Sequence, residues 1–307
     1  MVAGAGAGVD AVGIPASMQA QVEAWFNALV VASKGILFEG GPLKASCDGD
    51  PLTSWGIIGI VHEYRASQGR LSMYYYNLAG APLTEFKVDI PVVPYLRFQL
   101  GPCPTGLDVG GKAQQVFMCE CLQPFLGAPA LGVSFLLEGR PHSFLLRLPV
   151  SACSFMDPLQ ASAADETPFA GRSWDMLGGP SNEDACQVRA ASPVTGERWA
   201  EIRGMITSGM KMGVTDGVPG SGAGSPTLHA AGTFRTGSTT PEGKKISLGA
   251  MLRLEAEPAS GTFRVTLRAV HGTVASSLRD VLAAKLGGGT IGRGSVDVGG
   301  GSGGVGA

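Results

Sequence analysis

The chain has 307 residues, enough for one large domain or two modest ones. Its 23 basic and 25 acidic residues give a net charge of −2, which excludes a basic field for nucleic acid and gives no attraction to a membrane surface. The sequence shows neither a signal-peptide pattern nor an apolar run long enough to span a bilayer. We therefore expect a cytoplasmic protein that recognises its partners through local groups of charges.

Six cysteines are present, and in this compartment we expect reduced thiols. Cys119 and Cys121 would share one face of a strand, but no second cysteine or histidine pair at metal-ligand spacing follows them. Buried structural cysteines are therefore the preferred interpretation. The sequence predicts neither a metal site nor a cofactor.

Glycine-rich stretches divide the chain. Residues 1–30 are expected to form a flexible segment that contains one short amphipathic helix beginning near Ser17. Residues 287–307 are expected to be a disordered Gly-rich tail, and a flexible Gly-rich insertion is expected near residues 217–226. The remaining chain carries two regions with different patterns.

The first region, residues 31–152, carries short apolar or alternating segments separated by Gly, Pro, Asp and Ser. β-Branched and aromatic residues are frequent in these segments, and strands at this spacing indicate a β-sandwich. The predicted strands are Gly35–Phe38, Trp55–Tyr64, Arg70–Asn77, Phe86–Val93, Val116–Leu122, Ala130–Leu137 and His142–Val150.

The second region, residues 153–286, mixes helix and strand patterns. A sheet with helices packed on it would satisfy both patterns, which indicates an α+β subdomain. Helices are predicted at 160–166, 197–202 and 273–286, the last with Thr273 as its N-cap, and strands at 204–214, 228–236 and 246–254.

The last hairpin, Met251–Arg268, sorts its side chains by parity, as a half-buried antiparallel sheet does. One face is apolar and carries Leu252, Leu254, Phe263, Val265 and Leu267. The other face carries Met251, Arg253, Glu255, Arg264, Thr266 and Arg268. The helix predicted at 273–286 has an apolar stripe that can cover the first face, which leaves the second face open to a ligand. Solvated ion pairs are the alternative explanation of the charged face, and the residues alone favour it.

The catalytic motifs in the sequence are incomplete. Gly106–Lys112 nearly matches a phosphate-binding loop, but Ala113 stands where a Ser or Thr is needed and a strand is predicted next. Gly300–Gly304 has the spacing of a nucleophile elbow but follows no strand. The four histidines are scattered. We therefore expect no enzymatic activity and no catalytic residue.

The hairpin contains the runs Leu252-Arg-Leu-Glu255 and Phe263-Arg-Val-Thr-Leu-Arg268, and Thr273-Val274 follows. Softer matches elsewhere are Gly35-Ile-Leu-Phe-Glu39, Gly111-Lys-Ala-Gln-Gln-Val116, Glu120-Cys121, Ala128-Pro-Ala-Leu131 and Leu148-Pro149. In this order, the pieces resemble the appendage, or ear, of the α-subunit of the endocytic clathrin adaptor complex (α-adaptin). The resemblance covers residues 30–286.

The resemblance implies a mixed β and α+β fold. An immunoglobulin-like β-sandwich subdomain over residues 31–152 would be followed by an α+β platform subdomain over residues 153–286, an antiparallel sheet backed by helices. It also implies binding of Asp-Pro-Phe, Asp-Pro-Trp or Phe-x-Asp-x-Phe motifs in the disordered tails of endocytic accessory proteins. Such binding supports clathrin-mediated endocytosis and intracellular protein transport. The other implied partners are an adaptor core and the clathrin coat at plasma-membrane coated pits, with membrane contact only through the coat.

The family's platform site centres on a tryptophan in a Phe-Phe-x-Arg-Trp run. The nearest equivalent here is Phe169-Ala-Gly-Arg-Ser-Trp174, which lacks one Phe and has one extra residue. The resemblance implies a peptide-binding site formed by Trp174, Arg253, Glu255, Arg264, Arg268, Phe169 and Glu183. A second groove on the sandwich would map onto Gln114 and Gln115, although Leu78 replaces a lysine usual in that groove.

Three alternatives stay open at this point. The first is an appendage of a β-subunit or of another vesicle coat, because such appendages share the arrangement of a sandwich followed by a platform. An enzyme whose site is assembled from scattered residues would instead show a deep polar pocket. A structural sandwich protein without a peptide partner is the third alternative.

Overall fold

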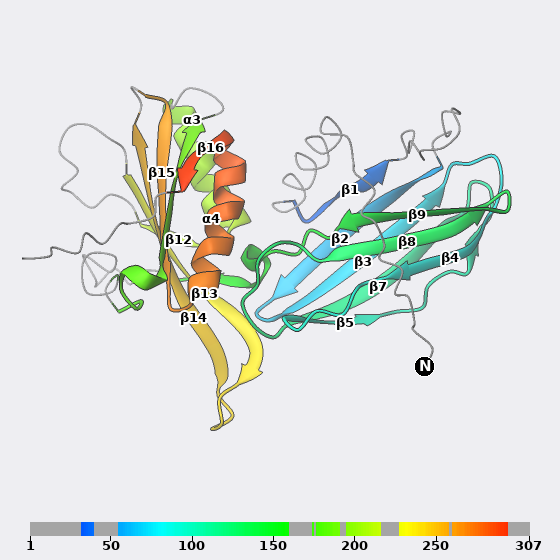
Figure 1. Ribbon diagram of the computed structural model, residues 1–307, viewed down its shortest axis with the longest axis horizontal. Helices are drawn as coiled ribbons and strands as arrows, with labels where there is room; N and C mark the ends of the chain where they lie inside the picture. The colour runs from blue at the N-terminus through cyan, green and yellow to red at the C-terminus, as the bar shows by residue number, and fades with distance from the viewer. Residues whose placement is uncertain are drawn as a thin grey trace, which may run out of the picture.

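A computed structural model of the chain describes residues 32–39, 55–159, 174, 176–190, 195–215, 227–257 and 260–293. The strands in these residues form three antiparallel sheets of five, four and seven strands (Figure 1). The five- and four-stranded sheets pack as a sandwich, and the seven-stranded sheet lies beside it with two helices.

The sandwich is built from the first nine strands. One sheet has the order β1–β2–β3–β7–β5, with β1 (Lys34–Glu39), β2 (Gly56–Arg65), β3 (Gln68–Asn77), β7 (Lys112–Cys121) and β5 (Leu96–Leu100). The other has the order β6–β4–β8–β9, with β6 (Gly106–Leu107), β4 (Leu83–Asp89), β8 (Ala130–Leu137) and β9 (Arg140–Arg147).

Alternation along the strands turns one face of each sheet into the sandwich core. Tyr75 of β3 crosses between the sheets to Phe86 of β4, with 5.1 Å between ring centroids, and Phe86 lies 6.2 Å from Phe135 of β8. All three side chains are buried. The predicted β-sandwich is confirmed, and each of the seven predicted strands overlaps an observed one. The prediction missed β5, although Leu96-Arg-Phe-Gln-Leu100 alternates as a strand should.

The seven-stranded platform sheet has the order β10–β13–β14–β15–β11–β16, with β12 paired to β13. Its strands are β10 (Met156–Pro158), β11 (Glu183–Ala190), β12 (Gly213–Thr215), β13 (Thr227–Thr239), β14 (Lys245–Glu257), β15 (Thr262–Ala269) and β16 (Gly287–Arg293). Its helices are α3 (Gly196–Gly204) and α4 (Gly272–Leu286), and short 3-10 turns lie at η1 (Ala152–Phe155) and η2 (Pro180–Asn182). The predicted α+β arrangement is confirmed.

Three local predictions about the platform were wrong. The segment 204–214 was expected to be a strand, but Met205–Gly209 continues α3 as a π-helix turn, η3, and only Gly213–Thr215 is strand. Residues 287–293 were expected to be disordered, but they pair with β11 as the edge strand β16. Helix α4 is capped by the imidazole of His271, which accepts from the Thr273 backbone N–H, and not by Thr273 itself. The helix predicted at 160–166 lies outside the described residues.

Both helices cover the same face of the platform sheet. Leu278 and Leu282 of α4 are fully buried, as the predicted apolar stripe requires. Trp199 of α3 stacks on Phe263 of β15 with 6.4 Å between ring centroids. Figure 1 shows α4 on the side of this sheet that faces the sandwich. The opposite face of the platform sheet therefore points away from the sandwich.

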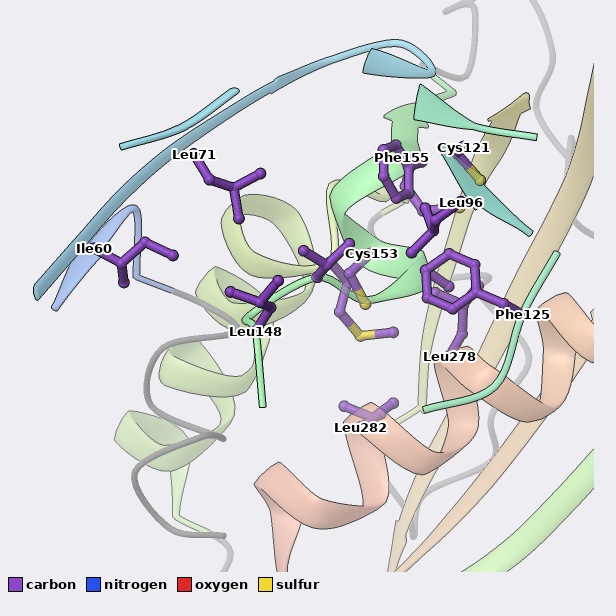
Figure 2. Packing of buried hydrophobic residues seen from close by; sticks show 14 of the residues in the cluster. Ile60, Leu71, Leu96, Cys121, Phe125, Leu148, Cys153, Phe155, Leu278 and Leu282 are labelled. Atoms are coloured by element: carbon purple, nitrogen blue, oxygen red, sulfur yellow. The ribbon is translucent and has the colours of Figure 1, made fainter. Parts of the chain in front are cut away.

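The platform and the sandwich share one hydrophobic cluster. Figure 2 shows Leu278 and Leu282 of α4 close to Cys153, Phe155 and to side chains of the sandwich. A division of the chain at residue 152 therefore stays a proposal, because the core runs across it. Within the described ranges, no helix is both long enough and apolar enough to cross a membrane.

Candidate functional site

The face of the platform sheet opposite α4 carries the charged residues of the hairpin. Residues paired across antiparallel strands share a face, and the register pairs Met251 with Arg268, Arg253 with Thr266 and Glu255 with Arg264. The parity predicted from the sequence is therefore confirmed. On the next strand, β11, Glu183 pairs with Arg268 and joins the same face.

Trp174 lies over this face near its Met251 end. Together with Leu177, its side chain packs on Ala231 of β13 and Met251 of β14, a small apolar patch separate from the main core. Both sheet residues are buried under this contact, while Trp174 stays half-buried. The structure thus brings Trp174 to the charged hairpin, although 77 residues separate it from Met251 in the sequence. The ring leaves part of its surface available to a ligand.

Arg268 is fully engaged within the protein. Its Nε and Nη2 donate to Glu183 Oε2 at 3.1 and 2.6 Å, and its Nη1 donates to the Trp174 carbonyl at 3.0 Å. The guanidinium also lies against the Trp174 ring, with 4.7 Å from Cζ to the ring centroid. Its side chain is only 9% exposed. Arg268 therefore positions Trp174, through both its backbone and its ring.

Arg253 and Arg264 are held more loosely than Arg268. Their Nε atoms lie 3.6 and 3.9 Å from Glu255 Oε2, beyond hydrogen-bond distance. Their side chains are 38% and 56% exposed. Arg253 also reaches the Trp174 ring, at 5.8 Å from Cζ to the centroid. These two guanidinium groups, and not that of Arg268, are the ones that an incoming carboxylate can meet.

A hollow with a volume of about 270 Å³ opens on the outer face of the five-stranded sheet. It is lined by Tyr74, Tyr75, Tyr76, Lys112, Ala113 and Gln114. Lys112 Nζ lies 4.9 Å from the centre of the Tyr76 ring, and Gln114 Nε2 donates to the Tyr74 hydroxyl at 3.3 Å. The hollow is aromatic with one ammonium group, at the place where the resemblance implied a second groove. Lys112 of β7 is the cationic residue that lines this hollow.

Gln115 does not belong to this hollow. Neighbouring residues of a strand point to opposite faces, so Gln114 and Gln115 cannot both line one groove. Gln115 is 2% exposed; its Oε1 accepts from the Tyr75 hydroxyl at 3.0 Å, and its Nε2 donates to the Gly101 carbonyl at 2.8 Å. The placement of Gln115 in a surface groove is therefore corrected, and its role is to satisfy buried polar groups.

The remaining residues that the sequence singles out are Phe169, Cys119 and Cys121. Phe169 lies outside the described residues. Cys119 and Cys121 are buried, and burial raises the pKa of both thiols to about 12. Both side chains lie in the sandwich core, where they serve packing.

Sequence reasoning missed several residues that line the two sites. Ala231 lies under Trp174, and Leu177 packs on the same two sheet residues as Trp174. His229 lies on the same sheet face because it pairs with Arg253. The alternation within the strand predicted at 228–236 places His229 and Ala231 on one face of the sheet. It does not determine whether that face is the one covered by α4 or the opposite one. The contribution of Lys112 requires the register between β3 and β7, which pairs it with Tyr76.

Comparison with known proteins agrees with this architecture. Residues 57–144 match the family described as the adaptin C-terminal domain. The chain is 26% identical over 269 residues to AP-2 complex subunit alpha-2 of Dictyostelium discoideum, an alignment that covers 88% of this chain and 24% of the relative. It is also 26% identical over 265 residues to AP-2 complex subunit alpha-1 of Arabidopsis thaliana, covering 85% of this chain and 23% of the relative.

The chain thus spans about a quarter of the length of the curated relatives it matches. Among solved structures, the GAE domain of yeast GGA1 aligns with 34% of this chain and 96% of its own length, at 17% identity and a TM-score of 0.27. This TM-score is too low for the superposition to indicate a shared fold. The relation of this chain to the adaptin C-terminal domain family therefore rests on the sequence similarities, with which the sandwich and platform agree.

Proposed function

Because this chain is an appendage domain of the α-adaptin type, we propose that its platform face binds short acidic and aromatic peptide motifs. The proposed motifs are Asp-Pro-Phe, Asp-Pro-Trp and Phe-x-Asp-x-Phe, carried by disordered tails of endocytic accessory proteins. The relatives are subunits of an adaptor complex and not enzymes, so the chain is an adaptor domain without a catalytic role.

One observation carries the proposal: Trp174 stands beside Arg253, and the Nε atoms of Arg253 and Arg264 both lie beyond hydrogen-bond distance of Glu255, with which they form loose ion pairs. A guanidinium group donates two parallel hydrogen bonds to a carboxylate in fixed geometry. A tryptophan ring offers an apolar wall for a second ring. A motif with one acid and one aromatic residue therefore matches both halves of the site.

Binding of one motif is expected to be weak. The face is open and small, so we expect a dissociation constant on the order of micromolar for a single motif. Useful affinity would come from several motifs on one tail that meet several appendages on one coat. Attachment to an adaptor core, assembly with clathrin and a place at coated pits belong to the same proposal. An appendage of another coat complex would use the same site with different motifs.

The proposal predicts a requirement for the ligand's carboxylate and for Arg264. A peptide containing Asp-Pro-Phe should bind, and the same peptide with Asn-Pro-Phe should bind at least about tenfold more weakly, because a charge-assisted hydrogen bond is lost. Arg264→Ala should cause a similar loss. Titration calorimetry or fluorescence anisotropy would give the dissociation constants.

Arg97→Ala is a matched control for Arg264→Ala, because Arg97 is also exposed and paired with a glutamate, Glu120, on the sandwich. It should bind the peptide as the wild type does. Equal affinity for the acid and amide peptides would contradict the proposal.

The hollow on the sandwich supports a second candidate function, a separate site for aromatic motifs. Its Tyr74 and Tyr76 rings offer stacking surfaces, and Lys112 and Gln114 offer donors for the backbone carbonyls or the acid of a peptide. The site would act independently, since it lies on the outer face of another sheet.

A two-step variant series tests this second site. An aromatic peptide that still binds the Trp174→Ala protein should lose about tenfold in affinity when Tyr74→Ala is added, because one stacking wall is removed. NMR titration should also show shifts of the Tyr74, Lys112 and Gln114 amides. Unchanged binding in the double variant would show that the hollow is not a peptide site.

A further inference from the structure

One row of side chains crosses the platform face next to Trp174. Its members are His229 of β13, Arg253 of β14 and Thr266 of β15, because the register pairs His229 with Arg253 and Arg253 with Thr266. Neighbouring strands lie about 4.8 Å apart, so the imidazole stands beside the guanidinium. The row is two residues along β14 from Met251, on which Trp174 rests.

Polar atoms in this row and in the neighbouring Glu255 lack hydrogen-bond partners, although Glu255 Oε2 lies within ion-pair distance of Arg253 and Arg264. Arg253 Nε, Glu255 Oε2 and Thr266 Oγ1 are buried and have no hydrogen-bond partner in the part of the chain that the structure describes. Thr266 is wholly buried. A buried polar group without a hydrogen-bond partner destabilises the folded state. Three such atoms on adjacent strands indicate a place where a polar ligand or its water completes the hydrogen bonds.

We propose that His229 and Arg253 together receive the acidic side chain of a bound motif, and that His229 makes the site prefer a carboxylate more strongly as the pH falls. The inference rests on the proposed peptide-binding function and deepens it. His229 is thus a specificity-determining residue that the hairpin sequence does not contain.

The charges around His229 set the direction of this effect. From β14, Arg253 stands opposite it and Glu255 lies two pairs further along, on the same face; the paired residue of β12, Thr215, is uncharged. Burial and then Arg253 lower the pKa of His229, while Glu255 raises it. His229 is therefore neutral in the free protein near neutral pH. A carboxylate placed beside it favours the imidazolium and raises its pKa in the complex.

Binding would then be coupled to proton uptake. The affinity should increase as the pH falls below about 6.5, the ordinary pKa of histidine, towards the lowered pKa of the free protein. The aspartate of the ligand has an ordinary pKa of about 3.9, so it stays charged at pH 5.5. Lower pH thus charges the receptor without neutralising the ligand.

The test compares dissociation constants at pH 7.5 and 5.5 for an Asp-Pro-Phe peptide. Wild-type protein should bind at least about threefold more tightly at pH 5.5, since a pKa shift of one unit changes affinity up to tenfold. His229→Gln, which keeps a polar side chain but cannot titrate, should lose this gain. The Asn-Pro-Phe peptide should show no gain with either protein.

His142→Gln is the control for histidine titration elsewhere, because His142 lies on β9 of the sandwich and stacks on Phe135. It should keep the wild-type pH profile. In wild-type protein, the His229 imidazole resonance followed by NMR should titrate at higher pH with the Asp-Pro-Phe peptide bound than without it. This measurement needs no substitution.

The possible results distinguish the role of His229 from peptide binding at the platform face itself. Binding at pH 7.5 with the same pH profile in wild type and His229→Gln, or an unchanged His229 titration in the complex, overturns the inference and leaves the proposed function standing. No binding of the Asp-Pro-Phe peptide at either pH overturns both.

Discussion

Replacing Trp174 with alanine is expected to lower the affinity for the Asp-Pro-Phe peptide by at least about 30-fold, which is the effect of losing an interface hot spot. The indole supplies an apolar surface for the ligand's ring, and its contacts with Arg253 and Arg268 hold it in place. Loss of the ring removes both the wall and the surface on which the guanidinium groups lie. No other described aromatic side chain packs on Ala231 and Met251.

Leu177→Ala is the matched control for this effect. Leu177 packs on the same two sheet residues as Trp174 but offers no ring to a ligand. We expect Leu177→Ala to bind the peptide within about fivefold of wild type, because it removes apolar contact without removing the wall. Anisotropy titrations of both variants with one labelled peptide measure the difference. Equal losses would mean that the patch matters for stability and that Trp174 is not a binding residue.

Replacing Arg268 with alanine is expected to lower the free energy of unfolding by about 3–5 kcal/mol, the cost of breaking a buried ion pair. Glu183, whose side chain is only 18% exposed, would be left without its partner, and the Trp174 carbonyl would lose a donor. Peptide affinity should fall as well, because Trp174 would lose its support. Denaturant unfolding followed by circular dichroism measures the stability, and anisotropy measures the binding.

Two further variants identify what Arg268 does. Arg264→Ala removes an exposed guanidinium group. It should therefore lower the affinity for the peptide but change the free energy of unfolding by no more than about 0.5 kcal/mol. Adding Glu183→Gln to Arg268→Ala should recover part of the lost stability, because no unpaired carboxylate remains. Were Arg268→Ala as stable as wild type but unable to bind, Arg268 would contact the ligand directly and its positioning role would be wrong.

The sequence predicted those parts of the fold that depend on local periodicity. The sandwich strands, the hairpin parity and the apolar stripe of α4 all follow from alternation or helical spacing. The π-helix turn after α3 did not, because Met205–Gly209 has no pattern that separates a helix extension from a strand. Strand β16 was missed because a glycine run lacks side-chain periodicity, and only pairing with β11 defines it.

The residues of the candidate site could be proposed from the sequence, but the different roles of its arginines could not. The hairpin sequence shows three arginines and no difference among them. The difference comes from β11 and Trp174, which enclose Arg268 and leave Arg253 and Arg264 towards solvent. Likewise, Gln114 and Gln115 are equivalent in the sequence until the sheet turns one outward and the other inward.

The hydrophobic cluster shared by α4 and the sandwich has a consequence for ligands that carry two motifs. Leu278 and Leu282 of the platform pack in the same cluster as side chains of the sandwich (Figure 2), so this packing resists a change in the separation of the platform face and the sandwich hollow. An unfolded chain spans at most about 3.5 Å per residue, so the spacing between motifs decides whether one tail can occupy both places. If both proposed sites bind motifs, tails with sufficiently long spacers between their motifs should therefore be favoured.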